Sequence, residues 1–139
     1  MQWLFWACLS AFFAGLTAFL AKIGVSGLDS NLATAIRTTV VLVFSWSIVF
    51  VTSGGIDVQG ISRKTWIFLV LSGVATGLSW LCYFRALQIG ELSKVAPVDK
   101  LSVVIAMGLG ILFLHERLTA REGIGGVCIA AGALILAWK

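Results

Sequence analysis

Hydrophobic residues occur in five long runs, separated by short polar or glycine-containing stretches. At about 1.5 Å of rise per helical residue, runs of this length approach or cross a hydrocarbon core of about 30 Å. The pattern therefore predicts an all-α integral membrane protein with five spanning helices in a single domain, residues 1–139. We expect the helices near Trp3–Ala21, Leu32–Thr52, Trp66–Leu87, Val95–Leu114 and Gly123–Trp138.

Composition supports this class of protein. Of the 139 residues, 60% are hydrophobic and 12% are charged, which leaves nothing for a soluble domain. The net charge of +4 would suggest a nucleic-acid partner in a soluble protein, but here the cations flank or interrupt apolar runs, as bilayer anchors do. Cys8, Cys82 and Cys128 lie in three different runs without metal-ligand spacing, so we expect reduced thiols and neither a metal nor another cofactor.

Small polar residues and glycines mark the ends of the runs. Ser30 and Ser93 precede the second and fourth runs and are expected to be helix N-caps. Gly24 and Gly90 follow the first and third runs and are expected to end those helices.

The fourth run carries charges where a membrane span is required. A helix that began only at Leu101 would hold 14 residues up to Leu114, about 21 Å, which is too short to cross. The helix is therefore expected to extend back through Lys100, Asp99 and Pro97. A charge at the centre of a spanning helix costs about 2.5–3.5 kcal/mol, so its default interpretation is functional.

The same length argument predicts that a cation of the second helix also lies within the membrane. Val40–Thr52 has 13 residues, about 20 Å, so the second helix must extend back through Arg37. The third helix is already long enough without Arg85, whose side chain can extend to the interface. Lys22 follows a complete first span and is expected to be an interfacial anchor.

Topology groups these charges. The first and third loops lie on the same side of the membrane, so Arg37, Asp99 and Lys100 are expected in the same half of the bilayer, with Arg85 at its edge. Asp99 can pair with one cation, which leaves another for an anionic or zwitterionic substrate, and the hydroxyl of Tyr83 is a candidate contact. The alternative is that Asp99 is an ion-pair staple that holds the second, third and fourth helices together.

Other residues are expected to serve packing. Gly73 and Gly77 have the spacing of a close helix contact, and Trp80 continues the same helical face. For Gly73, Gly77 and Trp80, a role in helix packing is favoured over a role in lining a substrate site. The last run is rich in small residues, including Gly126, and is expected to be the packing or dimer helix.

Cations are nearly balanced between the two membrane faces, which gives only a weak preference for a cytoplasmic N-terminus. A near tie is consistent with insertion in both orientations, and two opposed copies would form an inverted repeat. A fixed orientation, as a monomer or a parallel dimer, remains open. The cations are Arg63, Lys64, Arg117 and Arg121 on the N-terminal face, and Lys22, Lys94 and Lys139 on the other.

Three segments carry a family resemblance, and together they span nearly the whole chain: "AIRTTVVLVF", "YFRALQIGELSKVAPV" and "FLHERLTAREGIGGVCIAAGALIL". The chain resembles one EamA domain of the drug/metabolite transporter superfamily, in its short five-span, single-repeat form. The resemblance implies a multi-pass transporter of the inner membrane that works as a homodimer, with the two copies antiparallel. Arg37 matches the arginine of the family's second span, and Glu116 matches the glutamate that closes the fourth, a structural residue. Asp99 and Lys100 depart from the long members, which have uncharged residues there, so the substrates of those members transfer poorly.

These observations favour a secondary transporter. No G-x-x-x-x-G-K-[ST] motif is present, which disfavours ATP-driven transport by this chain, and the uncharged first run disfavours the cation antiport of small multidrug-resistance relatives. The alternative is a non-transporting membrane subunit that stabilises or scaffolds a partner. No nucleophile–base pair or metal-ligand constellation is visible, so we do not expect an enzyme.

Overall fold

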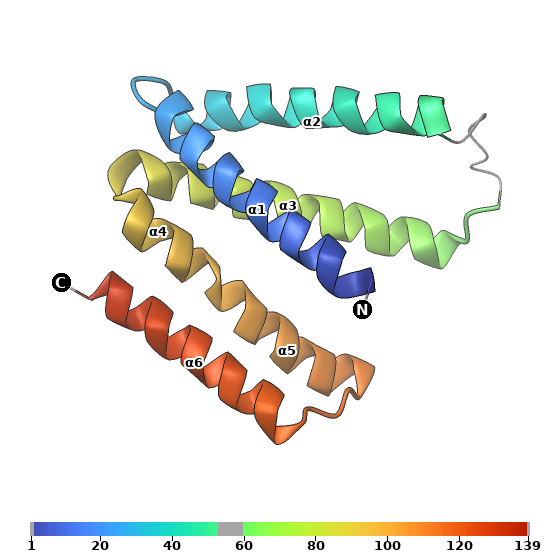
Figure 1. The fold of residues 1–139 in the computed structure, drawn as a ribbon. Coiled ribbons are helices and arrows are strands. Elements are labelled where there is room, and N and C mark those ends of the chain that lie inside the picture. Colours follow the sequence, from blue (N-terminus) through green and yellow to red (C-terminus); the bar gives the residue numbers. More distant parts are fainter. Residues whose placement is uncertain (1, 53–59, 139) are drawn as a thin grey trace. The chain divides into compact units, whose positions relative to one another are not determined.

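The computed structural model describes residues 2–52 and 60–138, and within them it is all-α, with five helices long and apolar enough to cross a membrane (Figure 1). This confirms the predicted fold class. Lys139, one of the cations compared above, lies outside the described residues. One span is interrupted, so six helical segments are labelled: α1 Gln2–Gly24, α2 Ser30–Thr52, α3 Arg63–Ile89, α4 Leu92–Asp99, α5 Leu101–Leu114 and α6 Ala120–Ala137.

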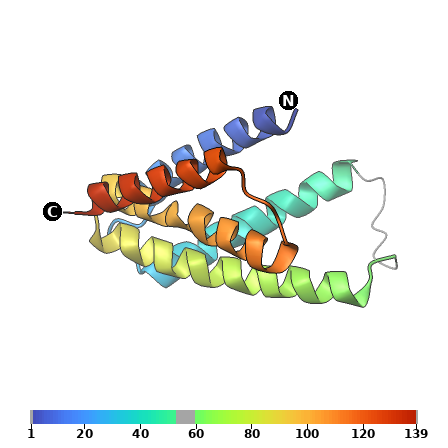
Figure 2. The same ribbon diagram turned by 90° about the horizontal axis from the view of Figure 1, so that it is seen from below.

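The chain folds as two compact units. Ala21–Gln88 contains the end of α1 together with α2 and α3, and is called the α2–α3 unit below. Met1–Leu20 and Ile89–Lys139 contain most of α1 together with α4, α5 and α6, and are called the α4–α6 unit. Within the α2–α3 unit, the two long helices run antiparallel, lie closest where α2 begins and α3 ends, and diverge toward their other ends (Figures 1 and 2).

The turn from α1 to α2 depends on one glycine and one carboxylate. Gly27 has a φ of 78°, in the left-handed region that residues with a Cβ rarely adopt. Asp29 Oδ1 accepts hydrogen bonds from the backbone N–H groups of Asn31 and Leu32, each at 3.0 Å, which makes Asp29 the N-cap of α2. The prediction of Ser30 as the N-cap is therefore wrong by one position, because Ser30 is already the first residue of the helix.

Few side chains of the α2–α3 unit are fully buried. Val25, in the turn after α1, is 1% exposed, and Leu87, near the end of α3, is 0% exposed. Phe84 is also buried, one turn before the end of α3. Large apolar side chains are instead exposed along every spanning helix, as a protein requires when its solvent is lipid.

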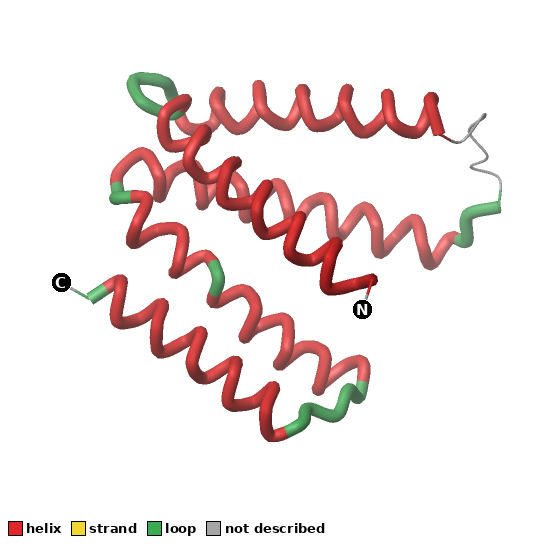
Figure 3. The backbone as a smooth tube through the Cα atoms, in the orientation of Figure 1, coloured by secondary structure: helices red, strands yellow, loops and turns green. Residues whose placement is uncertain are grey.

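The fourth span, Leu92–Leu114, is bent at Lys100, where α4 ends and α5 begins (Figure 3). Pro97 lies inside α4 and has no N–H to donate to the preceding turn. The N–H of Lys100 bonds to the carbonyl of Pro97, and the carbonyl of Lys100 accepts from the N–H of Val103, both at 3.0 Å. This three-residue spacing is tighter than an α-helix, so the hydrogen-bond ladder of the span is interrupted next to its charged pair.

The start of α4 also differs from the prediction. Its N-cap is Glu91, whose side chain makes no capping hydrogen bond, and not Ser93, which lies inside the helix. Glu91 Oε2 instead lies 2.9 Å from Lys94 Nζ, an ion pair between residues three apart.

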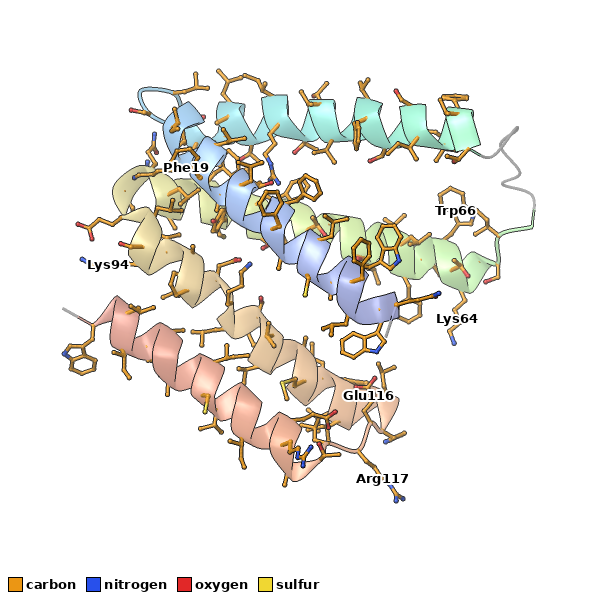
Figure 4. All side chains as sticks on the ribbon, viewed as in Figure 1. Phe19, Lys64, Trp66, Lys94, Glu116 and Arg117 are labelled. Atoms are coloured by element: carbon orange, nitrogen blue, oxygen red, sulfur yellow. The ribbon has the colours of Figure 1, made fainter. Side chains whose placement is uncertain are left out.

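The turn between α5 and α6 lets α6 return along α4 and α5 within the α4–α6 unit. His115 adopts the left-handed conformation, with φ 54° and ψ 31°, and ends α5. Thr119 and Glu122 form a capping box at the start of α6: Thr119 N donates to Glu122 Oε2 at 2.7 Å, and Glu122 N donates to Thr119 Oγ1 at 3.4 Å. Glu116 and Arg117 both lie at this turn (Figure 4).

Candidate functional site

Arg37, a cation within the second candidate span, contacts aromatic rings. It lies in the second turn of α2, and its Cζ is 4.2 Å from the ring centroid of Trp80 and 5.5 Å from that of Phe84. Trp80 and Phe84 are four residues apart on α3, so both rings lie on the face that meets Arg37. Cation–π attraction of this kind is worth about 0.5–1 kcal/mol at exposed sites and about 2 or more where water is excluded.

Arg37 has no carboxylate partner within the described ranges 2–52 and 60–138. The ion pairs found there join Lys94 to Glu91 and Lys100 to Asp99. Within those ranges the guanidinium of Arg37 contacts aromatic rings and forms no ion pair, and the residue is only half-buried. A guanidinium in this state has donors left for an anion.

Two more predicted residues, Tyr83 and Arg85, lie on α3 between Trp80 and the end of that helix. Tyr83 is half-buried and lies within electrostatic range of Arg37. Arg85 is exposed, and its Nη1 donates to Gln88 Oε1 at 2.5 Å, while Gln88 Nε2 donates to the carbonyl of Leu28 at 2.9 Å. Arg85 thus forms a side-chain hydrogen bond near the end of α3.

Asp99 and Lys100 form their ion pair with each other. Lys100 Nζ lies 3.3 Å from Asp99 Oδ2, at the bend between α4 and α5. The pair is local, between neighbours in sequence, and belongs to the α4–α6 unit, whereas Arg37, Tyr83 and Arg85 belong to the α2–α3 unit. The structure thus joins Arg37 to Trp80, and Asp99 to Lys100. That Arg37, Arg85, Asp99 and Lys100 lie in the same half of the bilayer stays a prediction.

The residues assigned to packing behave differently from one another. A Cβ built at Gly126 of α6 would lie 3.3 Å from the Met107 side chain of α5, which is a close approach of two helices. At Gly73 and Gly77 a built Cβ would meet nothing within 4 Å among the described residues. Close helix packing at those two glycines therefore stays a prediction.

Glu116 folds back over the preceding helix. A Cβ built at the buried Gly110 would lie 2.7 Å from Glu116 Oε2, and the carbonyl of Gly110 accepts a hydrogen bond from Glu116 N at 3.2 Å. These contacts place Glu116 in the turn that ends the fourth span.

An apolar groove of about 490 Å³ runs between α5 and α6. It contains no titratable side chain, so it offers nothing to an anion, and we do not assign the substrate to it. Its lining includes Met107, Ile111, Leu118, Gly126, Val127 and Leu134.

Two polar contacts of the α2–α3 unit were missed by sequence reasoning. The Nζ of Lys22 donates to the carbonyl of Leu87 at 2.5 Å, a contact that its expected role as an interfacial anchor did not include. Gln88 was not singled out, although its position three residues after Arg85 is a signal for a side-chain pair on a helix. Both contacts join the turn after α1 to the end of α3.

Comparison with known proteins gives one family. Residues 1–138 match the family described as the EamA-like transporter family. An uncharacterized transporter in the cobO 3′ region of Sinorhizobium sp is 52% identical over 136 residues, which cover 98% of this chain and 96% of that protein. The uncharacterized transporter YvbV of Bacillus subtilis is 32% identical over 103 residues, 74% of this chain but only 33% of that longer protein. No solved structure matches this chain.

Proposed function

Because the chain belongs to the EamA-like transporter family, we propose that it moves a small anionic or zwitterionic metabolite across the inner membrane as a homodimer. Its five apolar helices and the transporter names of its relatives make it a multi-pass membrane transporter. The observation that carries the proposed choice of substrate is Arg37, a cation within a spanning helix that contacts rings and no described carboxylate.

The proposed binding residues are Arg37, Tyr83, Arg85, Asp99 and Lys100. Arg37 attracts the negative group of the substrate, with Tyr83 and Arg85 on the neighbouring helix. Asp99 and Lys100 lie at the bend of the fourth span, where an interrupted hydrogen-bond ladder allows movement. Discontinuous helices with charges near the break are a recurring element of secondary transporters. In this proposal, the ion pair between Asp99 and Lys100 opens as the carrier changes state, and the two charges then bind the substrate.

The proposed homodimer follows from the number of spans. Many transporters contain two repeats related by inverted topology. The described residues of this chain contain five candidate spans, and an odd number of crossings would place the first and last of these helices with their outer ends on opposite sides of the membrane. YvbV aligns with this chain over only a third of its own length, and is thus more than twice as long as this chain. Two copies of this chain, one inverted, would supply the two repeats that the longer relative is long enough to contain in a single chain.

Metabolite profiling of cells tests the proposal. Cells that express the wild type, Arg37→Gln, Asp99→Asn or Arg63→Gln would be compared with cells that lack the chain, inside and in the medium. We expect one or more carboxylate-bearing metabolites to change with the wild type and with Arg63→Gln, which alters an exposed cation in the first turn of α3. Arg37→Gln and Asp99→Asn should lose the change.

Size-exclusion chromatography of each purified variant would establish that it is still folded and dimeric. The site assignment is wrong if both variants behave as the wild type does. A monomeric wild type that is fully active would exclude the homodimer. A wild type that causes no change, and that purifies only with a second protein, would support the alternative of a scaffolding subunit.

A further inference from the structure

The guanidinium of Arg37 is held by two rings of the neighbouring helix. Trp80 lies 4.2 Å and Phe84 lies 5.5 Å from Arg37 Cζ, measured to the ring centroids. Phe84 is buried, with 4% of its surface exposed, so its ring is fixed by its surroundings. The 4.2 Å separation of Arg37 Cζ from the Trp80 centroid allows the guanidinium to stack on that ring. A stacked guanidinium keeps its N–H groups in its own plane, where they remain free to donate.

The other candidate charges are already engaged. Asp99 and Lys100 neutralise each other at 3.3 Å, and Arg85 donates to Gln88 at 2.5 Å. Arg37 differs because its described partners are rings, which accept no hydrogen bond in the guanidinium plane. Of these four groups, Arg37 is the one with neither a described carboxylate partner nor a described side-chain hydrogen bond, so its charge and its in-plane donors are available for a ligand.

We propose that Trp80 and Phe84 are positioning residues that hold the Arg37 guanidinium edge-on to the substrate, and that the substrate binds there through a single carboxylate. This inference rests on the proposed function, since it names the ligand class of the same site. Paired N–H donors of one guanidinium match the two oxygens of one carboxylate. A phosphate monoester carries about 1.5–2 negative charges at pH 7, so one arginine would leave part of that charge uncompensated inside the membrane.

The positioning role is tested by the reactivity of Arg37 itself. Purified full-length protein in detergent would be treated with phenylglyoxal, which modifies accessible guanidinium groups, and the modification of Arg37 would be followed by mass spectrometry with Arg63 as internal reference. We expect Arg37 to react about fivefold faster in Trp80→Leu, which loses the ring, and at the wild-type rate in Trp80→Phe, which keeps one. Phe68→Leu, on an exposed position of α3, is the matched control and should change nothing. Equal rates in the wild type and Trp80→Leu would overturn the positioning role.

The ligand class is tested by thermal unfolding with defined probes. Acetate, benzoate and L-leucine supply one carboxylate each, whereas succinate supplies two and inorganic phosphate supplies none. We expect at least one monocarboxylate to raise the melting temperature of the wild type and not of Arg37→Gln. Its half-saturating concentration should rise about fivefold in Trp80→Leu and recover in Trp80→Phe, without a change in the melting temperature of the ligand-free protein.

The carboxylate assignment fails if none of the three monocarboxylates acts through Arg37, or if phosphate or succinate does so instead. The two proposals fail in different ways. If Arg37→Gln abolishes the metabolite change in cells but Trp80→Leu alters neither reactivity nor affinity, the transporter site stands and the positioning role is wrong. If Arg37→Gln leaves the metabolite change intact, the proposed site itself is wrong.

Discussion

The ammonium nitrogen of Lys22, near the end of α1, lies 2.5 Å from the carbonyl oxygen of Leu87, near the end of α3. The last carbonyl groups of a helix have no partner within the helix, and they carry the negative end of its dipole. A lysine that donates to one of them satisfies the carbonyl and balances that charge. Leu87 is completely buried, so water is a poor substitute at this place.

Lys22→Met should therefore destabilise the α2–α3 unit. It keeps most of the side-chain volume but removes the charged donor, and we expect a loss of about 1–3 kcal/mol in the free energy of unfolding. Unfolding in mixed detergent measures it. Lys94→Met is the control, because among the described residues the ammonium of Lys94 forms an exposed ion pair with Glu91, and its loss should cost less than about 1 kcal/mol. Equal effects of the two substitutions would show that the carbonyl of Leu87 does not depend on Lys22.

The close approach of α5 and α6 at Gly126 gives a second prediction. Valine at this position would drive its side chain into Met107, which already lies 3.3 Å from a built Cβ, so we expect a loss of about 1–3 kcal/mol in the free energy of unfolding. The matched substitution is Gly125→Val on the same helix, where a built Cβ meets nothing within 4 Å among the described residues. Both place valine in one helix, so their intrinsic helix propensities cancel. The prediction is contradicted if Gly125→Val is as destabilising as Gly126→Val.

Gly110 and Glu116 should be coupled. Alanine at position 110 would place a methyl group 2.7 Å from the present position of Glu116 Oε2, and the carboxylate must move away. Because the end of a glutamate side chain is flexible, we expect Gly110→Ala to be less stable than Gly108→Ala by less than about 1 kcal/mol. The difference should disappear in a Glu116→Ala background, as a double-mutant cycle would measure. A difference that persists without Glu116 would exclude this contact as its cause.

Pro97 should control the bend at Lys100. Pro97→Ala restores an N–H that can bond to the carbonyl of Ser93 and removes the clash of the proline ring with the preceding turn. We expect a straighter fourth span in which the amides of Lys100 and Leu101 exchange with solvent more slowly, as hydrogen-exchange mass spectrometry would detect. Transport should fall, although the variant is at least as stable as the wild type. Ala96→Ser, a neighbouring substitution that keeps the proline, should leave exchange at Lys100 unchanged, and unchanged exchange in Pro97→Ala would place the cause of the bend elsewhere.

The membrane class, the number of candidate spans and the position of Arg37 within the second of them were accessible from the sequence. Each depends on length and hydropathy, because a hydrocarbon core of about 30 Å demands a minimum number of residues in every helix. The helix starts were harder. Ser30 and Asp29 are both good N-cap residues, and only the hydrogen bonds to Asn31 and Leu32 select Asp29.

Contacts between helices depended on the tertiary structure. Trp80 was favoured as a packing residue from its spacing to Gly73 and Gly77, and the tertiary structure adds the contact of its ring with Arg37 of another helix. For Lys22, which was expected to be an anchor in the interface, it adds the hydrogen bond to Leu87, 65 residues further along the chain. Hydropathy sets how deep a residue lies in the bilayer and leaves the rotation of each helix about its axis open. That rotation is set by the packing of neighbouring helices, and it decides which side chains Arg37 meets.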